Sequence, residues 1–355
     1  MRTRLQKLRS QFDHLGIDAF LVTFAPHLHY LSGFSGSSGI GLVTQHTAYL
    51  LSDGRYALQA KKQAQGWKVF ISYDSLFAEL ERRQLLRSSW RVGVDGNTVP
   101  YASYQTLSKK FPKIRFHPTA EVIENIAAIK DASEIKSIKH AVAITDRVFK
   151  ELLEIIRPGL RELDIAAEIS HRQRTHGAEA DAFETIVASG KRGALPHGRA
   201  SAKKIFRGEL VTLDFGCVYE GYHSDLTRTV AVGKPTAEAK KIYQTVLDAQ
   251  RRAIDGAFNG MRAKDLDGIA RSYINAKGYG KFFPHSLGHG LGLQVHEPPR
   301  ISMQSRARLR TGNVITIEPG IYIPHRGGVR IEDDVLIRNG QCEILNRAPK
   351  ELLII

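Results

Sequence analysis

The chain has 355 residues, 42% of them hydrophobic and 25% charged, which is an ordinary composition for a globular protein long enough to form two domains. Lys and Arg outnumber Asp and Glu by 51 to 36, a formal net charge of +15. No basic run exceeds two residues, so a solvated basic surface is favoured over a nucleic-acid interface, and no nucleic-acid partner is expected. The two cysteines lack a CxxC spacing and no apolar run approaches a membrane span, which favours a cytoplasmic protein without membrane association.

The first third of the chain predicts an α/β domain. Leu5, Leu8 and Phe12 have helical spacing, and the helix ends at Gly16 before a strand-like "AFLVT", which indicates an αβ unit instead of a signal peptide. Short strands then alternate with helical stretches to about residue 125. The predicted strands span residues 19–23, 39–44, 48–53, 67–73, 91–96 and 114–119.

A second domain is predicted to begin near residue 128. Apolar side chains recur every three or four residues from Ile135 to Ile156, until "RPG" at 157–159 stops a long amphipathic helix. A second helix is predicted over 163–177, and strands and turns dominate the remainder. We therefore expect domains at 1–127 and 128–355, the second a helix-flanked, largely antiparallel α+β domain.

Two acidic residues are predicted to face each other in the segment 210–232, "LVTLDFGCVYEGYHSDLTRTVAV". A hairpin folded about Tyr219 and Glu220 sets Asp214 opposite Asp225. Directly opposed carboxylates destabilise a sheet unless something between them compensates. A bound cation is the economical explanation.

The same arrangement recurs over residues 313–337. A hairpin centred on His325 pairs Glu318 with Glu332. For one such pair a solvated edge is the simpler interpretation, because bulges shift strand register. Two pairs, together with His289 between Gly288 and Gly290, favour a metal site instead.

Four carboxylates and one imidazole form an oxygen-rich set suited to two divalent cations. This set favours Mn over Zn, with Co, Zn and Fe as alternatives. His289 is predicted to be the one nitrogen ligand, and its flanking glycines are expected to let the backbone approach the metals closely.

These motifs carry a family resemblance. "LDFG", "HSDLTRT", "HSLGHGLGLQVHE", "TIEPGIY" and "GVRIEDD", in this order, resemble the metallopeptidases with the pita-bread fold, which include methionine aminopeptidase, prolidase and aminopeptidase P. "YLSGF", "LLSDGRY" and "IKDASEIKSIKHAV" are similar to the creatinase-like N-terminal domain and linker of the Xaa-Pro-cleaving branch. The resemblance implies an α/β creatinase-like domain followed by an α+β pita-bread catalytic domain.

The resemblance also implies a dinuclear metal site. Asp214 and Asp225 would bind one metal, Asp225 and Glu332 would bridge toward the second, and His289 and Glu318 would complete that second site. A water or hydroxide shared by the two ions would be the nucleophile. Glu318 would be the general base and proton carrier.

Four further residues gain roles from the resemblance. His197 and His296, each of which alone would read as a structural histidine, are expected to contact the scissile carbonyl or the developing oxyanion. His285 is expected to contact substrate or to hold the His289 loop. Arg330 is expected to contact a substrate carboxylate or to orient a ligand carboxylate.

Basic residues around the loop of His197 suggest a basic rim. They could favour substrates with an exposed carboxylate, as an Xaa-Pro dipeptide has. They are Lys191, Arg192, Arg199, Lys203 and Lys204.

The function implied is a metal-dependent exopeptidase that cleaves the bond between an N-terminal residue and a following proline. The peptide-trimming class similar to aminopeptidase P is slightly preferred, and a dipeptidase similar to prolidase is the alternative. A creatinase-like amidinohydrolase and a metal-free binding module are remoter rivals, because neither needs four converging carboxylates. The resemblance suggests a homodimer whose substrates are peptides with proline at the second position.

Overall fold

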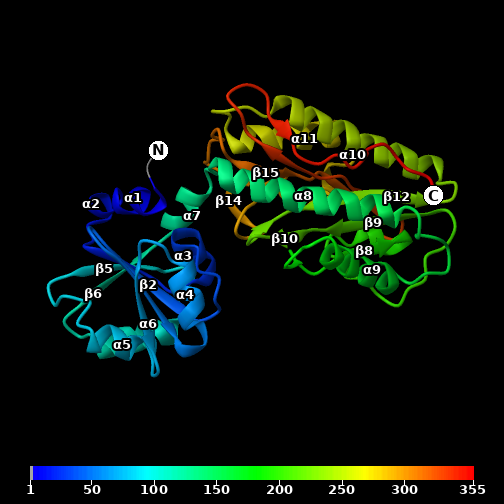
Figure 1. Cartoon of the computed structure of the whole chain (residues 1–355). Coiled ribbons are helices and arrows are strands. Elements are labelled where there is room, and N and C mark those ends of the chain that lie inside the picture. Colours follow the sequence, from blue (N-terminus) through cyan, green and yellow to red (C-terminus); the bar gives the residue numbers. More distant parts are fainter. Residues whose placement is uncertain (1–2) are drawn as a thin grey trace. The chain divides into compact units, whose positions relative to one another are not determined.

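The computed structural model describes residues 3–355, which form two compact units divided between Ala127 and Ala128. The first unit contains a six-stranded mixed sheet in the order β4-β3-β2-β1-β5-β6 (Figure 1). β2 pairs antiparallel with both β1 and β3, whereas the outer pairs and β1–β5 are parallel. The strands are β1 Ala19–Val22, β2 Gly39–Thr44, β3 Ala48–Asp53, β4 Lys68–Ser72, β5 Arg91–Asp95 and β6 Arg115–Thr119.

All six strands predicted for this unit are present, so the α/β prediction is confirmed. The core forms where buried strand residues such as Leu21 and Val94 pack against Leu80 and Leu107 of two helices. The helices are α1 Arg4–Arg9, α2 Phe12–Leu15, α3 Ala25–Ser32, α4 Ala57–Gln63, α5 Leu76–Arg82, α6 Tyr101–Lys110 and α7 Val122–Ala127, with a 3-10 turn at Gly54–Tyr56.

The second unit begins with its longest helix, α8. Asp131 caps this helix by accepting hydrogen bonds from the backbone N–H groups of Ser133 and Glu134, which satisfies donors that a helix start leaves open. The helices are α8 Ala132–Leu152, α9 Glu162–Thr175, α10 Ala237–Gly256 and α11 Ala263–Ala276, with 3-10 turns η2 Gly190–Ala194 and η3 Gly280–Phe282. Within residues 3–355, no helix is long and apolar enough to cross a membrane.

The strands of the second unit divide between two hydrophobic cores. α8 and α9 pack against the sheet β12-β9-β8, and α10 and α11 pack against β14, β15 and β18 and the β16–β17 hairpin. The named strands pair antiparallel throughout this unit, as predicted. They are β7 Ala180–Asp181, β8 Ile186–Ser189, β9 Glu209–Phe215, β10 Cys217–Tyr219, β11 Tyr222–His223, β12 Leu226–Val232, β13 Gly288–Gly290, β14 Glu297–Ile301, β15 Val314–Ile317, β16 Gly320–Ile323, β17 Gly327–Arg330, β18 Asp333–Leu336 and β19 Glu343–Ile344.

The predicted register of the first acidic pair is wrong. The turn consists of Glu220 and Gly221, with φ of 48° and 75°, one position further along the chain than predicted. Moving the centre of a hairpin by one residue moves each cross-strand partner by two, so Asp214 faces Thr227 instead of Asp225. A shift of two residues keeps a side chain on the same face, so Asp225 is still directed toward the side of the sheet that carries Asp214.

The predicted register of the second acidic pair is confirmed. The β16–β17 hairpin is centred on His325, and the β15–β18 ladder continues the same register. Glu318 and Glu332 occupy opposed positions between these two ladders. His325 itself has φ of 66°, as the tip of a tight reversal requires.

Candidate active site

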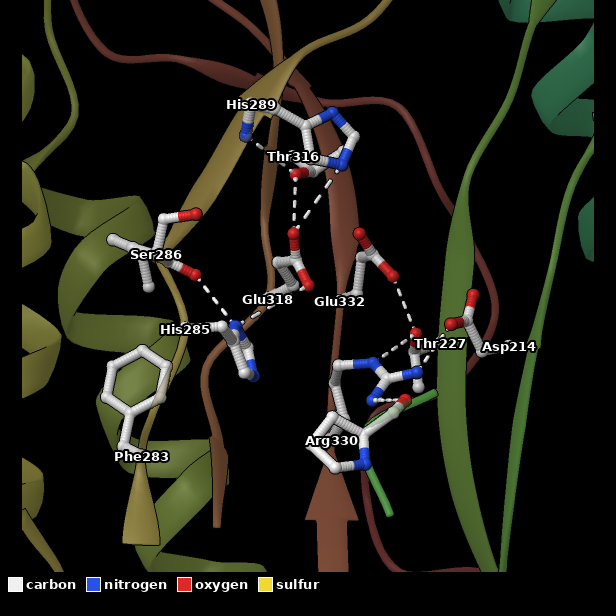
Figure 2. Close-up of polar contacts among 12 residues, drawn as sticks. Asp214, Thr227, Phe283, His285, Ser286, His289, Thr316, Glu318, Arg330 and Glu332 are labelled. Atoms are coloured by element: carbon white, nitrogen blue, oxygen red, sulfur yellow. Dashed lines mark hydrogen bonds and ion pairs between the residues drawn. The ribbon is translucent and has the colours of Figure 1, made fainter. Parts of the chain in front are cut away.

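Four carboxylates converge where the strands of the two cores meet. Asp214 is the penultimate residue of β9 and Asp225 precedes β12, while Glu318 and Glu332 interrupt the opposing ladder. Figure 2 shows the side chains of Glu318 and Glu332 next to each other beneath His289. The two cores are joined here, because the Glu332 backbone N–H donates to the carbonyl of Thr227 at 3.1 Å.

His289 presents a lone pair to this cluster. Its Nδ1–H donates to the Gly290 carbonyl at 3.0 Å, and burial lowers the pKa of the imidazole to about 3. Nε2 is therefore unprotonated, yet it lies 3.5 Å from Glu318 Oε1 and 3.8 Å from Asp225 Oδ2. A lone pair facing two carboxylate oxygens is repulsive unless a cation lies between them.

The electrostatics of the carboxylates also indicate that a cation is required at this cluster. Burial and the neighbouring acids raise the pKa of Asp225 and Glu318 well above the usual range, and burial with the charge of Asp214 raises that of Glu332 to about 8. Within residues 3–355, one oxygen each of Asp214, Asp225 and Glu332 is buried without a hydrogen-bond donor. Unpaired buried oxygens that face one imidazole lone pair fit divalent cations.

Arg330 orients two of the acids. Its guanidinium forms an ion pair with Asp214 and donates to Thr227 Oγ1, whose hydroxyl donates to Glu332 Oε2 at 2.6 Å (Figure 2). It also donates to the Tyr322 hydroxyl at 2.7 Å and to the Pro196 carbonyl at 3.1 Å. These contacts of a buried guanidinium support the orienting role predicted for Arg330.

His285 lies at the end of this chain of hydrogen bonds. Its Nδ1–H donates to the Ser286 carbonyl at 2.8 Å, so its Nε2 accepts from the Tyr322 hydroxyl at 2.9 Å. Burial lowers the pKa of His285 to about 4, which keeps this tautomer neutral. Its Nδ1 is 4.0 Å from Glu318 Oε2, so His285 borders the cluster.

The other two predicted histidines lie at the exposed edge of the site. His296 contacts His289 edge-to-face, with ring centroids 4.3 Å apart. Burial, and then the charge of His197, lower the pKa of His296. The structure thus brings all the predicted site residues together around one cluster.

The loop that carries His197 is held by Glu162, which sequence reasoning did not identify. Glu162 is fully buried and accepts hydrogen bonds from the backbone and hydroxyl groups of Ser189 and Ser201, which flank the loop. It also accepts from Arg192 Nε at 2.9 Å. Three residues assigned to a basic rim thus have acidic partners, because Arg199 pairs with the exposed Glu184 at 2.7 Å and Lys203 pairs with Glu209 at 2.7 Å.

The glycines around His289 have a packing role that the sequence did not indicate. A Cβ on Gly288 would lie 2.0 Å from the Thr316 carbonyl oxygen, and one on Gly290 would lie 2.2 Å from that of Pro298. Such contacts are too short for any side chain, so these positions require glycine for the approach of neighbouring strands.

Thr227 and Tyr322 also contribute more than the sequence indicated. Thr227 lies two residues after Asp225 in "HSDLTRT", so strand alternation places it on the same face. The Tyr322 hydroxyl accepts from Arg330 and donates to His285, so it links these two side chains. No local pattern marks Glu162, because its partners are 27 and 39 residues away in the chain.

Comparison with known proteins identifies the family. Residues 136–339 match metallopeptidase family M24, and residues 4–129 match the Creatinase/Prolidase N-terminal domain. The chain belongs to metallopeptidase family M24. This membership confirms the predictions of an enzyme and of a creatinase-like domain followed by a pita-bread domain.

Similar proteins include members named for two activities. This M24 chain is 41% identical over 355 residues to an Xaa-Pro dipeptidase of Pyrococcus horikoshii, covering 99% of both chains. Its fold matches that of an Xaa-Pro dipeptidase from Bacillus anthracis with a TM-score of 0.96 at 41% identity, covering 99% of both chains. It matches an X-Pro aminopeptidase from Thermotoga maritima MSB8 with a TM-score of 0.89 at 38% identity, covering 98% of this chain and 100% of the other.

Proposed function

We propose that this protein is a metal-dependent exopeptidase that hydrolyses the bond between an N-terminal residue and a following proline. One observation carries the proposal: in an M24 chain, the lone pair of neutral His289 faces Asp225 and Glu318, and ligand atoms of Asp225, His289 and Glu332 lie within 4.8 Å of one another. Both named activities among its similar structures concern X-Pro bonds. Neither a metal-free amidinohydrolase nor a binding module needs these five converging side chains.

The ion-binding roles proposed for the side chains are those that the family resemblance implies. Asp214 and Asp225 would hold one ion, His289 and Glu318 would complete the second site, and Asp225 and Glu332 would lie between them. The oxygen-rich set fits manganese, with cobalt, zinc and iron as alternatives. When bound, two such ions lower the pKa of a shared water and stabilise negative charge on the substrate.

Glu318 is the acid best suited to move a proton. It is the most exposed of the four, with a side chain 17% accessible, and burial raises its pKa well above the usual range. Its carboxylate would accept a proton from the attacking water and donate it to the proline nitrogen as the bond breaks. His285 Nδ1 lies 4.0 Å from Glu318 Oε2, so the neutral imidazole would border this carboxylate.

The two exposed histidines would bind the reacting carbonyl. His197 and His296 lie at the open edge of the cluster and interact with each other electrostatically. N–H groups placed there would donate to the carbonyl oxygen as it gains negative charge. Burial raises the pKa of Tyr322 to about 12, so its hydroxyl keeps its proton for His285 and fixes the floor of the site.

Two substrate lengths are proposed. An aminopeptidase trims longer peptides and has a similar structure in the Thermotoga maritima enzyme, whereas a dipeptidase is favoured by the names of the Pyrococcus horikoshii and Bacillus anthracis proteins. Either form is expected to be a cytoplasmic homodimer, which light scattering of the purified protein and cell fractionation test.

Hydrolysis of Ala-Pro and Ala-Pro-Ala tests the proposal directly. Chelator-treated protein is assayed with and without added Mn²⁺, beside Asp225→Asn and the matched control Asp265→Asn, whose carboxylate pairs with the half-exposed Arg262. Activity restored by metal in the parent and control but lost in Asp225→Asn supports the proposal. The ratio of the two substrates separates aminopeptidase from dipeptidase. Metal bound without cleavage of either peptide contradicts the substrate class.

A further inference from the structure

A second group of metal-binding side chains lies in the first unit, among residues that the catalytic proposal does not use. His27 comes from α3, Asp95 ends β5, and Glu124 comes from α7. His27 and Asp95 are 2% and 5% exposed, and the side chain of Glu124 is 10% exposed. Buried acids and histidines at three separate elements need a physical explanation.

The three side chains are as close together as those of the catalytic cluster. His27 Nδ1 is 3.2 Å from Asp95 Oδ2, and His27 Nε2 is 3.7 Å from Glu124 Oε1. One ligand atom from each lies within 4.8 Å of the other two, and Asp225, His289 and Glu332 meet the same limit. Closing such a set around an ion requires side-chain shifts of only about 1 Å, since metal–ligand bonds are roughly 2 Å long.

Hydrogen bonding leaves this group unsatisfied. Among residues 3–355, neither ring nitrogen of His27 forms a well-aligned hydrogen bond, although Nδ1 lies 3.2 Å from Asp95 Oδ2, and Oε2 of Glu124 is buried without a partner. Asp95 is fixed in place by the Asn97 N–H at 3.0 Å and the Thr98 hydroxyl at 2.9 Å. Buried polar atoms without partners are costly, so the group is incomplete as a hydrogen-bond network.

The balance of charge favours a divalent ion. Within residues 3–355, no Lys or Arg pairs with Asp95 or Glu124, and the other charge that acts on Glu124 is the acidic Glu121. Burial raises the pKa of Glu124, which marks its charge as poorly compensated. A protonated His27 between two carboxylates would leave a buried net negative charge, whereas a divalent cation bound by neutral His27 would balance both acids.

We propose that His27, Asp95 and Glu124 bind one divalent transition-metal ion, separate from the catalytic ions. One imidazole and two carboxylates suit Zn²⁺, with a water as fourth ligand. The ion would join α3, the end of β5 and α7, the last helix of the first unit. Its role is structural, because it fixes three elements that the sheet alone does not connect.

Zinc counting in the full-length protein tests this proposal. The parent for the test carries Asp225→Asn and Glu332→Gln, which weaken ion binding at the catalytic cluster. It is stripped with chelator, equilibrated with Zn²⁺, desalted, and measured by plasma mass spectrometry. His27→Gln is compared with His46→Gln, a matched change at an exposed histidine of the same unit.

The expected result is the loss of one zinc per chain in His27→Gln but not in His46→Gln. Glu124→Gln keeps side-chain size and gives the same loss, which covers the case in which His27→Gln does not fold. Circular dichroism checks folding of each variant. No zinc in the parent overturns the proposal, and so does equal zinc in the parent and both site variants, since an imidazolium paired with two acids then accounts for the group.

Discussion

The two units each bury a histidine among carboxylates, but the hydrogen bonds around the two histidines differ. In the second unit the Gly290 carbonyl fixes the tautomer of His289, and Arg330 and Thr227 orient the acids before any ion arrives. In the first unit neither nitrogen of His27 forms a well-aligned hydrogen bond among residues 3–355. This group contains two acids, whereas the cluster around His289 contains four. The comparison teaches that the catalytic cluster is preorganised by surrounding hydrogen bonds, whereas the first-unit group depends on its ion for order.

Removing a catalytic acid should have the largest effect. Glu332→Gln removes an acid that lies between the two proposed ions, and we expect activity to fall by about a thousandfold or more, because positioning of both ions is disturbed. Steady-state hydrolysis of Ala-Pro at saturating Mn²⁺ measures this fall. Glu154→Gln, at an exposed position on the same unit, is the control and should retain parental activity. A Glu332→Gln variant with near-parental kcat would exclude Glu332 from the ion-binding set.

Loosening the loop of His197 should lower activity less than removing an acid does, and without loss of metal. Glu162→Gln keeps the side-chain shape but weakens the bond from Arg192 and the bonds that tie both ends of the loop. We expect kcat/KM to fall roughly tenfold to a hundredfold, since misplaced donors stabilise a transition state poorly.

Metal content separates this positioning role from ion binding. Glu162→Gln should bind as much Mn²⁺ as the parent, while Asp164→Asn, at a partly exposed acid on the same helix, should change neither quantity. A loss of Mn²⁺ equal to the loss of activity would mean that Glu162 supports the metal cluster or the fold instead of the loop.

The sequence predicted the architecture of this cluster better than its support. Alternating apolar residues located the strands, and the turn at His325 gave the pairing of Glu318 with Glu332. The predicted position of the first turn was wrong by one residue, because Glu220 and Gly221 both adopt left-handed conformations and form the reversal one position further along the chain.

The remaining parts of the sites depend on long-range contacts that leave no local periodicity. Glu162 meets Ser201, and His27 meets Asp95, only after the elements between them have folded. The glycines beside His289 show the same limit, since the neighbouring strand backbones that require them could not be identified from a local motif. Residue types and spacing therefore predicted which acids and histidines lie close together, but not which side chains hold them.

The pH dependence of the free energy of unfolding without metal tests whether the acids of the second unit are buried together. Burial and the charge of Asp214 raise the folded-state pKa of Glu332 to about 8, from an ordinary value of 4.5, so the folded chain keeps a proton that the unfolded chain has lost. The contribution of Glu332 to the free energy of unfolding is therefore fully present below its ordinary pKa of 4.5. It is lost as pH rises from there through about 8. His285 and His289, with pKa values lowered to about 4 and about 3, act in the opposite direction only below about pH 6.5.

The informative window is therefore pH 6.5 to 8. Urea unfolding of chelator-treated protein should show a decrease of roughly 2 kcal/mol across this window, since one pKa unit corresponds to about 1.4 kcal/mol. Glu332→Gln should reduce the decrease, and saturating Mn²⁺ should remove it. A metal-free protein equally stable at both pH values would mean that the acids are not buried together in solution.

The smallest effect is expected at the edge of the site. Arg199 pairs with Glu184 at 2.7 Å, and the two side chains are 76% and 58% exposed, so solvent screens their charges. Arg199→Gln should therefore change kcat/KM for Ala-Pro by less than about twofold, because an exposed charge contributes little to binding a carboxylate that water already solvates. Arg192 is unsuitable for the same test, since replacing it would leave the buried Glu162 without its cation. A KM for Ala-Pro that rises several-fold in Arg199→Gln, with KM for Ala-Pro-Ala unchanged, would instead show that the rim reads the dipeptide carboxylate and would favour the dipeptidase.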